Sequence, residues 1–131
     1  MILTLPDDRT FHTDIPALAA EIARGALEAA ESRHPLIVAI REAWSHEVLV
    51  GLQGNRGFIQ VASSSGDPPY WATFNPEAAH SREEVVDFFL LGQHHTPIPV
   101  KHLVAESILW PALDAFLAAG VRSPRVNWRS V

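Results

Sequence analysis

The amino-acid sequence predicts an α+β fold, with a mainly antiparallel sheet of five to seven strands and two helices packed on one face. Residues 15–32 and 103–119 space their apolar side chains as amphipathic helices do. Between these helices lie five short segments rich in β-branched and aromatic residues, separated by turn-forming residues. Because short turns join consecutive strands in antiparallel order, these segments predict a meander that two helices can cover.

The N-terminal region predicts a short strand and then the first helix. Residues 2–5 are an apolar run that ends at Pro6, as expected for a strand followed by a loop. Asp14 is a good N-cap, and Pro16 follows in the first turn, where its missing N–H costs little. We therefore expect the first helix over residues 15–32.

The central part of the chain predicts a run of strands. The expected strands are residues 36–41, 47–53, 58–62, 70–74 and 84–91, with a final strand at 126–128. Turn-forming residues 54–57 should join the second and third of these strands in a hairpin. The segment 84–91 is apolar enough for a helical turn as well, but Gly92 and the loop-like residues 93–99 that bound it favour a strand.

The second helix contains a residue that conflicts with helical structure. Its apolar side chains fall on one face, and Gly120 is typical of the position just past a helix C-terminus. Pro111 lies inside the pattern and either kinks the helix or marks the start of its second part. The predicted order is strand, helix, five strands, helix and strand, in a single domain over residues 1–131.

Composition and charge exclude several functional classes. The 131 residues are 47% apolar, enough for a packed core, and the absence of cysteine excludes disulfides, thiolate metal sites and a cysteine nucleophile. The formal net charge of −5 disfavours direct nucleic-acid binding and suits a basic protein partner. The sequence shows neither a secretion signal nor an apolar run long enough to span a membrane, so we expect a cytoplasmic location.

Motifs for catalysis or metal binding are weak. Residues 63–66 lack the leading glycine and the following helix of a nucleophile elbow, which favours a polar loop. His102 and Glu106 are spaced to share a helix face, and His94 and His95 lie nearby in the sequence. These four residues leave open a small metal-dependent enzyme or a ligand-binding domain. The leading expectation is a protein without a cofactor that is not an enzyme.

The tryptophans divide into two pairs. Trp110 and Trp128 lie in strongly apolar segments and are expected in the core. Trp44 lies in a polar turn, and Trp71 follows a proline-containing loop. Because tryptophan is frequent at the centres of protein interfaces, Trp44 and Trp71 are candidates for contact with a partner. The same two side chains leave open the wall of a small-ligand pocket.

The C-terminal half resembles a known protein family. The segments that carry the resemblance are Phe88-Phe89-Leu90-Leu91-Gly92, Pro97-Ile98-Pro99-Val100, residues 112–120 and Ser123-Pro124-Arg125-Val126-Asn127-Trp128. They are similar to immunity protein family one of bacterial polymorphic toxin systems, whose members are small α+β proteins often paired with nucleic-acid deaminase toxins. The resemblance extends over residues 36–130, and Pro111 departs from it.

The resemblance implies a protein that neutralises a cognate deaminase-type toxin by occluding its active site. The acidic balance agrees with this, because a toxin that processes nucleic acid needs a positive surface. Loops on a rigid sheet are frequent recognition sites, so we expect the toxin domain to contact the loops of the meander. The expected contact residues are Asp67, Tyr70, Trp71, Glu77, Trp44 and Glu47.

Overall fold

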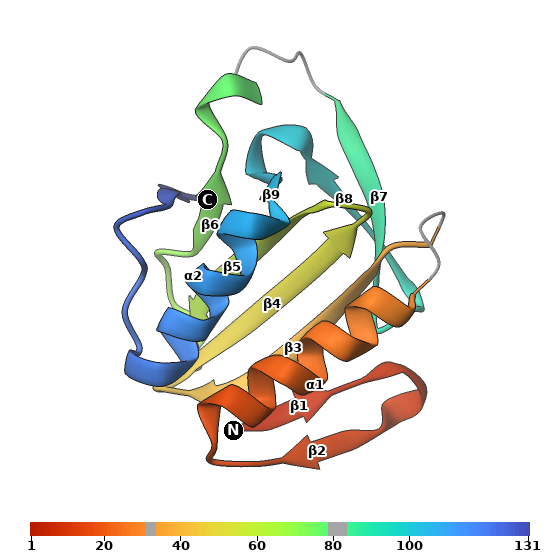
Figure 1. Ribbon diagram of the computed structural model, residues 1–131, viewed down its shortest axis with the longest axis vertical. Helices are drawn as coiled ribbons and strands as arrows, with labels where there is room; N and C mark the ends of the chain where they lie inside the picture. Colours follow the sequence, from red (N-terminus) through yellow and green to blue (C-terminus); the bar gives the residue numbers. More distant parts are fainter. Residues whose placement is uncertain (31–33, 79–83) are drawn as a thin grey trace.

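The computed structural model describes residues 1–30, 34–78 and 84–131, and it has the expected α+β architecture (Figure 1). The strands are β1 (Ile2–Thr4), β2 (Thr10–His12), β3 (Leu36–Ala43), β4 (His46–Gln53), β5 (Arg56–Ser63), β6 (Trp71–Phe74), β7 (Val85–Leu90), β8 (His94–Pro99), β9 (Val104–Ala105) and β10 (Asn127–Ser130). The helices are α1 (Pro16–Ala29) and α2 (Glu106–Ala119), with 3-10 turns η1 (Pro6–Asp8), η2 (Pro76–Ala78) and η3 (Val100–His102). No helix in these ranges is long and apolar enough to cross a membrane.

The strands form one ten-stranded sheet, in which seven follow one another in the order β10-β6-β5-β4-β3-β1-β2, with β7 and β8 joined through β3 and β9 joined through β5. Every neighbouring pair along this path is antiparallel, and β3 to β6 form the predicted meander. Both helices lie on the same face of the sheet (Figure 1), as expected. One pairing departs from the antiparallel pattern, because β7 pairs in parallel with the start of β3.

Several predicted boundaries were wrong. His94–Pro99, expected as a loop, forms β8 in a hairpin with β7. Its prolines are tolerated because β8 pairs with β7 alone, as an edge strand. The second helix begins at Glu106 and not at residue 103, because Val104–Ala105 pairs with β5 instead. α2 continues through Pro111, which is exposed to solvent.

The first helix also differs from its prediction at both ends. α1 is capped at Ile15 without a side-chain hydrogen bond, so Asp14 is not its N-cap. Pro16 occupies the first helical position as predicted. α1 ends at Ala29, and residues 31–32 of the predicted helix lie outside the described residues.

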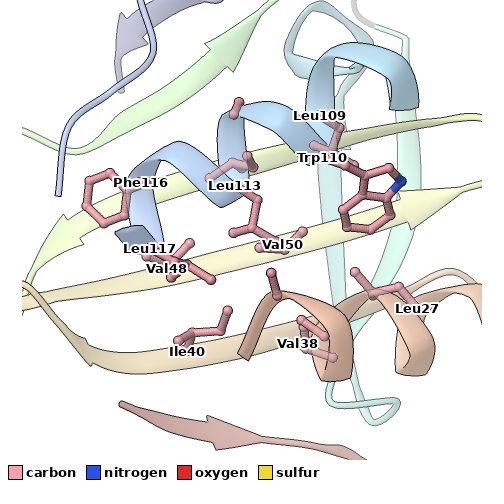
Figure 2. Packing of buried hydrophobic residues seen from close by; sticks show 14 of the residues in the cluster. Leu27, Val38, Ile40, Val48, Val50, Leu109, Trp110, Leu113, Phe116 and Leu117 are labelled. Carbon is pink, nitrogen blue, oxygen red and sulfur yellow. The ribbon is translucent and has the colours of Figure 1, made fainter. Parts of the chain in front are cut away.

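Side chains alternate along the strands and supply two cores on opposite faces of the sheet. On the helical face, Val38, Ile40, Val48 and Val50 pack against Leu27 of α1 and against Leu109, Leu113, Phe116 and Leu117 of α2 (Figure 2). On the opposite face, Ile37 and Phe58 pack with Val86, Phe88, Ile98 and Leu103. The β7–β8 hairpin therefore covers part of the face that the helices leave open.

Two glycines in the β4–β5 hairpin let both layers approach the sheet closely. A Cβ atom on Gly57 would collide with the carbonyl oxygen of Gly51 and lie 2.8 Å from Cδ2 of Leu109 in α2. A Cβ atom on Gly51 would collide with the ring of Phe58. That ring packs edge-to-face on Phe88 of β7, with 5.2 Å between the ring centroids. Gly57 thus makes room for α2, and Gly51 makes room for the contact to the β7–β8 hairpin.

Phe116→Ala should lower the free energy of unfolding by about 3–5 kcal/mol, because its ring is 2% exposed and the deletion leaves a cavity. Phe11→Ala is the matched control, since Phe11 on β2 is 38% exposed and should cost less than ~1 kcal/mol. Urea unfolding of the two variants measures the difference. Equal losses in both would contradict the placement of Phe116 in the core.

Candidate functional site

Five of the six expected contact residues, all but Glu77, come from segments that meet at one end of the sheet. Trp44 lies in the β3–β4 turn, and Glu47 follows in β4. The backbone N–H of Ser64 donates to the carbonyl oxygen of Ser45 at 3.0 Å, which joins this turn to the loop after β5. The same loop carries Asp67 and Tyr70 and leads into Trp71 of β6. We call residues 42–47, 63–71 and 117–122 the Trp44 end (Figure 1, where β3 turns into β4 and α2 ends).

Trp44 is exposed and yet fixed in position. Its side chain is 54% exposed, and Trp44 and Ser45 have φ values of 54° and 60°, a conformation that costs non-glycine residues roughly 1–2 kcal/mol each. The indole Nε1–H donates to the carbonyl oxygen of Leu117 at 3.0 Å, in the last turn of α2, where carbonyls lack helical partners. Gly120 adopts φ 68°, and a Cβ atom there would lie 2.7 Å from Cγ of Trp44. These contacts offset the strain and leave the outer part of the ring available.

The loop that carries Asp67 and Tyr70 is held by its own hydrogen bonds. The exposed carboxylate of Asp67 accepts a hydrogen bond from a serine hydroxyl of the loop at 3.0 Å, and the Tyr70 hydroxyl donates to the carbonyl of Gly66. Trp71 is half-buried, and the guanidinium of Arg122 lies 3.7 Å from its ring centroid. This cation–π contact covers Trp71 with a residue of its own chain. Trp44 is therefore the more accessible of the two indoles.

Glu77 lies apart from the other five residues. It belongs to η2, beyond the far end of β6, and the neighbouring Asn75 donates its N–H to the carbonyl of Lys101. It lines a separate hollow of about 400 Å³ that also contains Ile108 and Arg125. The structure therefore divides the predicted contact set into two surfaces.

Residues of α2 and the segment after it were missed as parts of this site. Leu117 and Gly120 contact Trp44 from more than 70 positions along the chain, with a separation of 73 residues for the hydrogen bond to Leu117, and Arg122 lies over Trp71. The sequence identified Gly120 as a helix cap, but no local pattern indicates which side chain packs against that cap. Long-range pairing of this kind becomes visible only when α2 is placed on the sheet.

The alternative histidine site does not assemble as its spacing suggested. His102 is 7% exposed, and its Nδ1 lies 3.0 Å from the carbonyl oxygen of Thr73, to which it donates. Because β9 separates His102 from the start of α2, His102 and Glu106 do not share a helix face. Neighbouring His94 and His95 on β8 point to opposite faces, and His95 contacts Asp87 at 2.7 Å. Within residues 1–30, 34–78 and 84–131, no three His, Asp or Glu side chains are placed to hold a metal ion.

The hollow beside Trp44 does not support the alternative of a small-ligand pocket shared with Trp71. Trp44 lines a hollow of about 210 Å³ with Met1, Asp14, Glu42 and Leu117, and Trp71 is not among its lining residues. Trp44 is held by Leu117 in the last turn of α2, and Trp71 is covered by Arg122 in the segment after α2.

Comparison with known protein families identifies one match over most of the chain. A family model described as "Immunity protein Imm1" matches residues 12–130. The match includes the Trp44 end, both helices and every strand from β3 onward. No curated protein matches the chain.

Gly120→Ala should displace Trp44 and destabilise the chain by more than the roughly 1–2 kcal/mol of left-handed backbone strain alone. The added methyl group would press on Trp44, so the hydrogen bond to Leu117 should weaken as well. The matched control is Gly54→Ala, because Gly54 has φ 62° and nothing within 4 Å of an added Cβ atom. Thermal unfolding and the Trp44 indole N–H chemical shift measure both effects. Identical behaviour of the two variants would refute the contact.

Stability should decrease as pH falls below about 6.5, because burial lowers the pKa of His102. The unfolded chain then binds a proton that the folded chain resists, so this contribution is complete above about pH 6.5 and is lost as pH falls through the folded-state pKa. His102→Asn keeps an N–H near Nδ1 but does not titrate. Urea unfolding across this pH range should show a shallower slope for the variant, and parallel slopes would count against the prediction.

Proposed function

Because the chain belongs to the Imm1 family of immunity proteins, we propose that it binds and neutralises a cognate bacterial toxin by covering the toxin's active site. The toxin is a nucleic-acid deaminase, and the chain inhibits it without performing chemistry. The family match supports the inhibitor role, and the resemblance of the C-terminal segments supports the deaminase. The inhibitor acts in the cytoplasm of the producing cell, and a cysteine-free chain suits that reducing compartment.

The choice of the Trp44 end as the contact surface rests on one observation. Trp44 is a large aromatic side chain that is 54% exposed although a hydrogen bond and Gly120 hold it in place. A side chain already fixed loses little conformational entropy on binding, and a tryptophan can supply much of the binding energy of an interface. Glu47 and Asp67 lie at the same end and provide carboxylates for cationic toxin side chains.

The proposed function predicts that a neighbouring gene encodes a protein with a C-terminal toxin domain, and it is tested with that domain. Equimolar addition of the chain should abolish deamination of a single-stranded nucleic-acid substrate, and the two proteins should co-purify. A toxin domain with another activity that the chain still inhibits would refute the deaminase assignment alone. Absence of both binding and inhibition would refute the proposed function.

Trp44→Ala should weaken toxin binding by about thirtyfold or more, because truncating a central aromatic anchor costs at least ~2 kcal/mol. Asp67→Lys should weaken it as well, by placing a positive charge against a basic toxin surface. Glu84→Lys changes charge equally but lies at the start of the β7–β8 hairpin, away from this end, and should bind normally. Calorimetric titration of folded variants measures each effect.

In the same titration, Glu77→Lys tests whether the toxin contacts the surface around η2 instead of the Trp44 end. Weakened binding by Glu77→Lys together with normal binding by Trp44→Ala and Asp67→Lys would move the interface to η2. Thermal unfolding of each variant serves as the control that the fold is retained.

A further inference from the structure

A groove runs between α1 and α2 on the outer side of the helical layer and ends at Trp44. Its main part is a hollow of about 580 Å³ between the helices. A second hollow of about 400 Å³ shares Arg24, Trp110 and Asp114 with it, and the hollow of about 210 Å³ at Trp44 shares Pro16. We call these three neighbouring hollows the helix groove.

The helix groove exists because the facing positions of the two helices carry small side chains. Ala17 and Ala20 of α1 and Ala118 of α2 line it, and none of them can fill the space between the helices. Trp110, only 7% exposed, lies at the junction of the two larger hollows. Its indole Nε1 has no hydrogen-bond partner among the described residues, and Figure 2 shows this nitrogen on the side of the ring away from Leu113. The groove is thus apolar at its base.

The rim of the helix groove is acidic. Five carboxylates line the three hollows, from Asp14, Glu21, Glu42, Glu106 and Asp114. Asp14 lies 3.4 Å from the terminal amine. The lining of the three hollows contains four other carboxylates and one guanidinium, so the groove has an excess of negative charge.

The single guanidinium, that of Arg24, indicates what the groove accepts. It lies 5.2 Å from the centroid of the Trp110 ring. A hydrogen bond that Arg24 Nε donates to the carboxylate of Glu28 raises the pKa of Arg24, and the charges of Glu106 and Asp114 act in the same direction. A cation over an aromatic ring with carboxylates around it is a favourable arrangement, and the remaining carboxylates extend it along the groove.

We propose that the helix groove binds a lysine- and arginine-bearing segment of the toxin, with one end of that segment against Trp44. The proposal rests on the proposed function and extends its contact surface from the Trp44 end along both helices. Apolar stems of lysine and arginine side chains fit the alanine-lined base while their charged ends reach the rim. A second copy of the chain would bring the same carboxylates to the groove, and repulsion between like charges disfavours that occupant.

The first test compares two double charge reversals in binding to the toxin domain. Glu21→Lys with Asp114→Lys changes two exposed groove residues and should weaken binding at least about tenfold, with a smaller dependence on salt. Glu84→Lys with Asp87→Lys changes net charge equally on the β7–β8 hairpin, across the sheet from the helices, and should bind normally. Ala17→Trp should also weaken binding, because it fills the groove without changing charge.

A second probe makes the groove testable without the toxin. An amidated helical peptide of lysine and alanine, titrated into the labelled chain, should shift backbone amide resonances of α1 and α2 and the indole N–H of Trp110. The groove double variant should lose these shifts, and the hairpin double variant should keep them. Shifts confined to other surfaces, together with toxin binding that the groove variants leave unchanged, would overturn the proposal.

The two probes separate this proposal from the proposed function. If the wild-type chain fails to bind or inhibit the toxin domain, the proposed function fails. The peptide titration alone then shows whether the groove binds a basic segment. If the toxin binds but neither groove variant weakens it, the groove proposal fails and the inhibitor function stands. Sedimentation of the wild-type chain adds a further check, because a dimer that Ala17→Trp dissociates would assign the groove to a second copy.

Discussion

The close approach of backbone at Gly51 and Gly57 is the constraint on which the two-sided architecture depends. Neighbouring strands present these glycines to opposite faces, and each leaves room for a large side chain from another layer. Leu109 brings α2 down beside Gly57, and Phe58 fills the space above Gly51 and reaches Phe88. A side chain at either position would push one layer away from the sheet. The position of α2, and with it the groove and the Trp44 end, follows from this packing.

The sequence predicted those parts of the fold that depend on local pattern. The meander, both helices and their common face follow from alternation, helical periodicity and turn residues. β8 was missed because its prolines and histidines resemble a loop, and only pairing with β7 makes it a strand. The start of α2 was misplaced because β5 pairs with Val104–Ala105, a non-local interaction that helix propensity does not report.

The candidate site was predictable to a similar degree. Trp44 and Asp67 were identified from aromatic and acidic residues in turns, and the structure brings these turns together through the bond between Ser64 and Ser45. Glu77 was grouped with them because it is near in sequence, but the length of β6 separates it from them. The helix groove had no sequence signal, because alanines on a helix indicate high helix propensity and not an empty space between two helices.

The edges of the sheet bear on how the chain behaves at high concentration. A strand at an edge presents unpaired backbone groups that can template pairing with another chain. Among the described strands, β2 has three residues and β10 has four, and the third edge strand, β8, contains Pro97 and Pro99, which lack a backbone N–H, so each edge offers few hydrogen bonds to a neighbour. A protein that is present at high concentration benefits from edges that do not template such pairing. Short or proline-containing edges therefore disfavour self-association of this chain through its sheet.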